Sequence, residues 1–157
     1  MKFMIPIVPK AQMRTGAGTV TLADGKVRGT VFKKKKQREA EGVLVALLEK
    51  YQPSVPMQGA LLLGVRAYLP MPAGKPKWYS GKPKEFHQDA RSGAVRPITK
   101  PDLDNLLKCV KDCLTTLQFW GDDKQVVGYL PDTGKYYSDR PRWEIEIVPF
   151  RAVGVLG

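Results

Sequence analysis

The segment from Asp102 to Leu117 constrains the fold more than any other part of this sequence. Asp102 and Asp104 stand at its start, directly after Pro101, and one Asp would suffice to cap a helix. Apolar residues then recur every three or four positions, which predicts a helix with one apolar face that ends near Gln118. These residues are Leu103, Leu106, Leu107, Val110, Leu114 and Leu117.

The other elements follow from shorter patterns. A helix is expected from a cap at Thr30 to about Tyr51, and a loose hairpin or loop before it turns at Asp24-Gly25. Gly121 is expected near the C-terminal cap of the later helix. Strands are expected at 3–8, 60–69, 125–130 and 142–148. This order predicts an α+β fold, a small mixed sheet covered by two helices, in a single domain over residues 1–157 with a long basic loop at about 70–100.

Charge narrows the class of partner. The formal net charge is +11, which implies an anionic partner, with nucleic acid favoured over an acidic membrane because the basic residues are spread through loops. No apolar run approaches the roughly 18 residues of a membrane span, so a cytoplasmic protein without membrane contact is expected. Cys109 and Cys113, with only His87 elsewhere, are expected to be reduced thiols and not zinc ligands.

Carboxylates are concentrated in one region of this basic chain. Asp102 and Asp104 precede the helix and Asp122 and Asp123 follow it, so a bound divalent cation is the economical explanation, although turn chemistry alone also explains the second pair. Lys108 lies four residues after Asp104 on the same helical face. It is either a surface partner of Asp104 or a cation aimed at a scissile phosphate. Carboxylates, Mg²⁺ and a lysine are the groups that hydrolyse a phosphodiester.

Two further basic segments are candidate DNA contacts. Each also has a plainer interpretation, as a solvated loop with a tethering aromatic or as a solvated helix face. The candidates are Lys33, Lys34, Lys35, Lys36, Lys75, Lys77, Trp78, Tyr79, Lys82, Lys84 and Lys100.

Two stretches resemble a known family. Residues 100–108 read KPDLDNLLK and residues 119–127 read FWGDDKQVV, and together they are similar to the signature of RusA-type Holliday junction resolvases (crossover junction endodeoxyribonucleases). Residues 135–137 and 142–147 are similar to the closing hairpin of that family, which is common in phages and prophages. The long loop at 70–100 departs from the family pattern.

The resemblance implies an activity and a set of site residues. Asp102, Asp104 and Asp123 would be metal-binding catalytic carboxylates, and Lys108 the essential lysine. The family acts as a homodimer on four-way DNA junctions with Mg²⁺ or Mn²⁺ and makes paired symmetric nicks in DNA recombination and repair. Two alternatives remain open: a nuclease for flap DNA, RNA or another branched substrate, and a catalytically inactive DNA-binding protein whose carboxylates only cap a helix.

Overall fold

A five-stranded mixed sheet forms the centre of the computed structural model, which describes residues 1–11, 16–32 and 35–151. The strands are β1 (Lys2–Ile5), β4 (Leu61–Pro70), β5 (Val126–Tyr129), β6 (Gly134–Ser138) and β7 (Arg142–Pro149). The central strand β4 pairs antiparallel with β7 on one edge and parallel with β5 and β6 on the other. Strand β1 pairs antiparallel with the other edge of β7.

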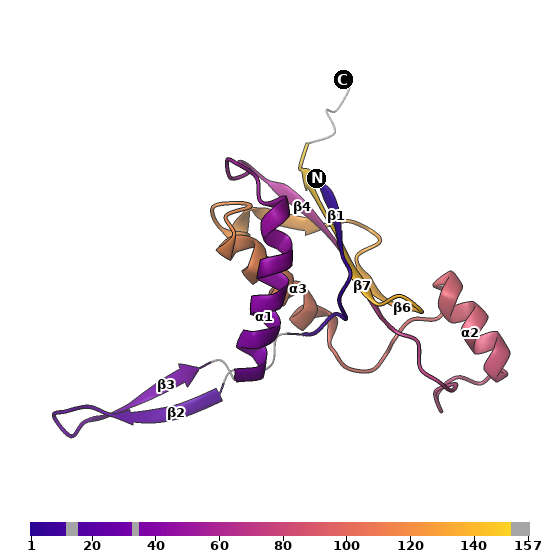
Figure 1. The fold of residues 1–157 in the computed structure, drawn as a ribbon, viewed down its shortest axis with the longest axis horizontal. Helices are drawn as coiled ribbons and strands as arrows, with labels where there is room; N and C mark the ends of the chain where they lie inside the picture. The colour runs from indigo at the N-terminus through magenta and orange to yellow at the C-terminus, as the bar shows by residue number, and fades with distance from the viewer. Residues whose placement is uncertain (12–15, 33–34, 152–157) are drawn as a thin grey trace.

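Two helices, α1 (Lys35–Leu48) and α3 (Leu103–Thr116), pack together and cover one face of this sheet (Figure 1). Alternate residues of β4 point to that face and are fully buried: Leu61, Leu63, Val65 and Ala67. Removing this apolar surface from water is the main driving force for assembling sheet and helices. The expected α+β fold with a mixed sheet and these two helices is therefore confirmed.

The opposite face of the sheet is polar. Arg66, on β4, is only 6% exposed and forms ion pairs with Asp132, Glu144 and Glu146. Burying a charge is tolerated when it is paired in this way. This face therefore has a charged network where the other has an apolar core.

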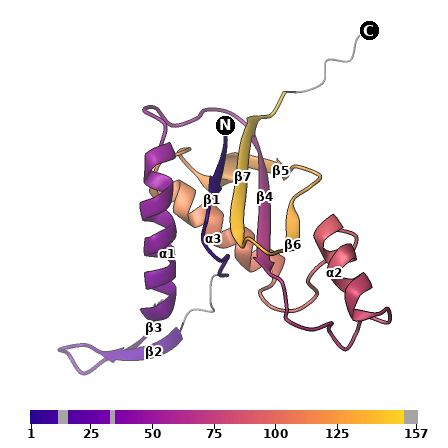
Figure 2. The same ribbon diagram turned by 45° about the vertical axis from the view of Figure 1, so that its right-hand side comes forward.

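A third helix, α2 (Pro83–Ser92), lies inside the region expected to be a loop. Figure 2 shows it beside β6, away from the two core helices. It buries Phe86 and Ala90 against Tyr137 of β6, in a small second cluster. The expectation of one long loop at 70–100 is thus wrong in part, because ten residues of it form a helix held by a distant strand.

The first predicted helix begins later than expected. Thr30 pairs with Gly18 inside a hairpin of β2 (Gly16–Thr21) and β3 (Val27–Phe32), so it caps no helix. The hairpin turns at the predicted Asp24-Gly25, where Gly25 has a φ of 79°. Figure 1 shows this hairpin projecting from the body of the molecule.

Two other local predictions change. Residues 134–138 form the strand β6, where the residue pattern predicted only a connection. The resemblance implied a closing hairpin of this stretch with residues 142–147, but β6 and β7 pair with opposite edges of β4 and not with each other. The C-cap of α3 is Leu117, and the left-handed residue that follows is Gln118, with a φ of 55°, not Gly121. Within the described residues, no helix is long and apolar enough to cross a membrane.

Candidate active site

Helix α3 has two chemically distinct faces. The inner face packs into the core through Leu106, Val110 and Leu114. Cys109 and Cys113 are buried beside them and form no disulfide. The hydrogen bond with Cys109, together with burial, raises the pKa of the Cys113 thiol. A thiol held protonated is unreactive, as expected for structural cysteines. The outer face carries the polar residues of the candidate site.

An open cavity of about 420 Å³ follows this outer face. It is formed between α3, the short 3₁₀ helix η2 (Asp123–Gln125) and the end of β5. Its lining residues are Asp104, Asn105, Leu107, Lys108, Lys111, Asp112, Asp123 and Tyr129. The structure therefore brings together three of the four predicted catalytic residues, Asp104, Lys108 and Asp123.

Asp102 stands at the N-cap of α3 and is not among the residues that line the cavity. Its backbone is extended, with a φ of −70° and a ψ of 143°, and its carboxylate accepts no capping hydrogen bond. Capping is the usual role of an Asp at this position. The exposed carboxylate of Asp102 therefore remains available for another ligand.

The two aspartates after the helix have different environments. Asp122 caps η2, because its carboxylate accepts a hydrogen bond from the backbone N–H of Lys124 at 2.9 Å. This backbone bond is the main reason that the pKa of Asp122 is lowered. The Gln125 side chain completes the turn by accepting from the N–H of Gly121 at 2.8 Å. Asp123 is thereby held at the cavity, while Asp122 stabilises the turn.

Lys111 is a cavity residue that the sequence reasoning missed. Its Nζ lies 3.8 Å from Oδ2 of Asp123. It follows Asp104 by seven residues, two helical turns, so its place on the same face could have been read from the spacing. Those seven residues correspond to a rise of about 10 Å along the helix axis. Asp123 thus lies beside the second half of α3, and Asp104 lies at its start.

The donor set matches the chemistry of a hard divalent cation. Asp104, Asp112 and Asp123 line one cavity, and Mg²⁺ prefers oxygen ligands such as carboxylates and retains several waters. In the described parts of the chain, no three acidic, histidine or cysteine side chains are grouped closely enough to hold an ion as they stand. The residue types fit a metal, and its binding requires the carboxylates to converge.

The basic-aromatic segment before α2 is more ordered than a solvated loop. The Tyr79 hydroxyl donates to Asp89 at 2.6 Å, and this hydrogen bond raises the pKa of Tyr79 to about 12. Nζ of Lys75 donates to the carbonyl of Tyr79. Trp78 is 40% exposed and touches Tyr79 and Phe86 edge to face, at centroid distances of 6.3 and 6.4 Å. Tyr79 and Lys75 therefore hold the segment together, and Trp78 presents an exposed ring.

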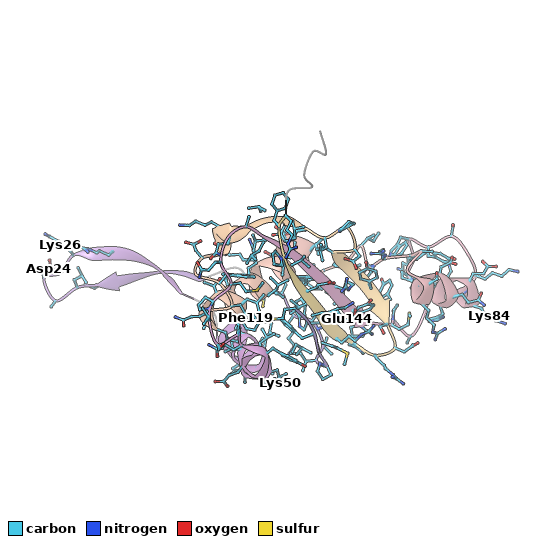
Figure 3. All side chains as sticks on the ribbon, turned by 90° about the horizontal axis from the view of Figure 1, so that it is seen from above. Asp24, Lys26, Lys50, Lys84, Phe119 and Glu144 are labelled. Atoms are coloured by element: carbon cyan, nitrogen blue, oxygen red, sulfur yellow. The ribbon has the colours of Figure 1, made fainter. Side chains whose placement is uncertain are left out.

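The remaining predicted DNA contacts lie at separate places. Lys77, Lys82, Lys84 and Lys100 are exposed. Figure 3 places Lys84 and the hairpin residue Lys26 at opposite ends of the molecule. Lys33 and Lys34 lie outside the described residues, as do the side chains of Lys35 and Lys36. All of these DNA contacts stay predictions.

Acidic and lysine side chains around one open cavity, on a strongly basic α+β protein, are features of the class of nucleases. The family model described as endodeoxyribonuclease RusA matches residues 6–148. The chain belongs to this RusA family of endodeoxyribonucleases.

Two relatives illustrate how far the similarity extends. An uncharacterized protein of Bacillus subtilis, YqaN, is 37% identical over 147 residues, which is 94% of either chain. The crossover junction endodeoxyribonuclease RusA of Lactococcus phage r1t is 41% identical over 49 residues, covering 31% of this chain and 36% of that protein.

Proposed function

We propose that this chain is a Mg²⁺-dependent, structure-selective DNA endonuclease that resolves Holliday junctions by paired symmetric nicks. The observation that carries the proposal is the shared cavity of Asp104, Lys108 and Asp123, in a member of an endodeoxyribonuclease family. The net charge of +11 supports a polyanionic substrate. Such an enzyme would serve DNA recombination and repair in the cytoplasm.

Each site residue then has a distinct task. Asp102, Asp104 and Asp123 would hold Mg²⁺, for which Mn²⁺ can substitute. When bound, the ion supplies an activated water and neutralises the phosphate. Lys108 places an ammonium group one helical turn beyond Asp104, on the face that lines the cavity, where it stabilises negative charge developing on the phosphate.

Paired nicks require two active sites in a symmetric arrangement. A homodimer with a twofold axis supplies them, since a four-way junction can present two equivalent strands to two equivalent sites. The exposed Lys77, Lys82, Lys84 and Lys100 would contact backbone phosphates. The exposed ring of Trp78 would stack on bases that are unpaired at the junction centre.

The decisive test compares three substrates of matched sequence: a synthetic four-way junction, a flap and a linear duplex. We expect cleavage of the junction alone, at symmetric positions, which EDTA abolishes while binding persists. Preferential cleavage of the flap would assign the same site to another branched substrate. Tight junction binding without cleavage in Mg²⁺ or Mn²⁺ would instead identify a DNA-binding protein without catalytic activity.

A further inference from the structure

Lys135 connects the sheet to the segment that precedes the candidate active site. It lies on β6, opposite Ala67 of β4. Its Nζ donates hydrogen bonds to the backbone carbonyls of Thr99 at 2.8 Å and Pro101 at 3.0 Å. Hydrogen bonds from an ammonium group are among the stronger ones in proteins. Asp102 follows this attachment point directly.

Contacts of Val95 and Arg96 hold the first half of the attached segment, but the stretch just before Pro101 is exposed. No residue between Gly93 and Asp102 belongs to a helix or strand. Thr99 and Lys100 are exposed, and Ile98 is 68% exposed. The carboxylate of Asp102 does not cap α3. Local side-chain capping therefore does not fix the start of α3, and the two bonds from Lys135 constrain it from across the fold.

The strand that carries Lys135 is itself well supported. The next residue, Tyr136, stacks on Tyr68 of β4 with ring centroids 5.0 Å apart. The Tyr136 hydroxyl donates to the carbonyl of Asp132 at 2.6 Å, and the Arg96 guanidinium lies 3.7 Å from the centre of its ring. Lys135 thus extends from a well-packed part of the sheet and can fix the position of the exposed segment next to it.

We propose that Lys135 is a positioning residue for the metal-binding carboxylates. By fixing the carbonyls of Thr99 and Pro101, it sets where Asp102 and Asp104 stand at the start of α3. This inference rests on the proposed function, in which these two aspartates hold a divalent ion. Mutation of groups that orient metal ligands without touching the metal lowers metal affinity or activity by about 10- to 100-fold.

The proposal predicts that loss of Lys135 changes the affinity for a divalent cation in the direction opposite to the one expected from charge alone. Lys135 carries a positive charge near an acidic site, and removing a nearby positive charge should strengthen the binding of a divalent cation. If Lys135 acts by positioning, its removal should weaken that binding. The direction of the change therefore separates positioning from a charge effect, without any measurement of catalysis.

The experiment measures Mn²⁺ binding to the whole protein without DNA, by calorimetry and by electron paramagnetic resonance. Lys135→Met should weaken binding by about 10-fold or more, and Lys135→Arg should recover part of the loss because it keeps a cationic donor. The matched control is Lys124→Met, which removes an 81% exposed ammonium beside Asp122 and should leave binding equal or tighter. Thermal unfolding of each variant checks that the fold persists, and Lys135→Gln replaces Lys135→Met if the latter does not fold.

Three results would overturn the inference. Mn²⁺ binding that is unchanged or tighter in Lys135→Met, or in Lys135→Gln, would show that Lys135 does not position the carboxylates. An equal loss of affinity in Lys124→Met would show a general loss of structure. Wild-type protein that neither binds Mn²⁺ nor cleaves a junction would overturn the proposed function as well, whereas the first two results leave it standing.

Discussion

Neighbouring Asp122 and Asp123 offer a matched pair of substitutions with opposite expected outcomes. Asp123 lines the cavity, and Asp122 caps η2. Asn caps a helix about as well as Asp, so the Asp122→Asn variant should keep the turn. It should cleave a junction at a rate within about three-fold of wild type, because a capping residue affects the rate less than a catalytic group does. Asp123→Asn removes a proposed ligand charge and should lower the rate by about 10²-fold or more, as the loss of one preorganised electrostatic group does.

Stability should not explain the difference. The Lys111–Asp123 pair has an N–O distance of 3.8 Å, and its side chains are 23% and 51% exposed. Such a pair contributes about 1 kcal/mol at most, which corresponds to a change in Tm of roughly 2–4 °C for a domain of this size. Both variants should therefore be folded at the assay temperature.

The assay is single-turnover cleavage of a four-way junction at saturating Mg²⁺, with thermal unfolding of the same samples. Asp122→Ala is the control for capping: it should lower Tm and the cleavage rate together, because η2 then presents Asp123 less precisely. Equal losses of rate in Asp122→Asn and Asp123→Asn would refute the division of roles. A rate for Asp123→Asn within ten-fold of wild type would refute the site itself.

Four more changes test the site and the basic-aromatic segment. Asp104→Asn should abolish junction cleavage while gel-shift affinity stays equal or improves, because a charge that repels the DNA backbone is lost; cleavage at the wild-type rate in ordinary Mg²⁺ would contradict this. Lys108→Ala should lower turnover in a way that added Mg²⁺ does not restore, and recovery at high Mg²⁺ would limit Lys108 to supporting the metal. Trp78→Ala should weaken junction binding by roughly 1–3 kcal/mol and spare duplex binding, whereas equal losses on both would make its role structural. The hydrogen bond to Asp89 favours the protonated phenol of Tyr79, so its stabilising effect is complete below the ordinary pKa near 10 and is lost as pH rises through about 12. Ultraviolet titration should show more than one late-titrating tyrosine, because burial also raises the pKa of Tyr68 and Tyr137. Asp89→Asn should return one of these tyrosines toward about 10, and no change on that substitution would contradict the assignment.

The sequence predicted best those elements that bury one face. The apolar spacing of α3, the apolar run of β4 and the alternation in β7 are local patterns, and all three elements appear where expected. Helix α2 was missed because only Phe86 and Ala90 of its ten residues are buried. Their burial depends on Tyr137, a partner far along the chain, and no local pattern reports such a contact.

The site residues that lie on one helix could be placed together from the sequence, whereas the residue that reaches the site from another part of the chain could not. The spacing of Asp104 and Lys108 places both on one face of α3, and the same helical periodicity places Lys111 on that face. Placing Asp123 at the site requires knowing where the chain runs after α3. That path depends on η2 and on Gln125, whose Nε2 donates to the carbonyls of Met57 and Gly59 at 3.0 Å each. These are long-range contacts that a linear pattern does not encode.

The position of β4 at the centre of the sheet has a consequence for how the chain folds. Leu61–Pro70 is an apolar strand, and every strand that pairs with it comes after residue 125. During synthesis, at about 5–20 residues per second, this strand therefore waits several seconds with both edges unpaired. Even β1, at residues 2–5, pairs with β7, which begins at residue 142. The nascent chain thus exposes an apolar strand with unpaired edges, which favours aggregation, until residues 126–149 have emerged. Chaperone binding near β4 during this interval should therefore raise the yield of folded protein.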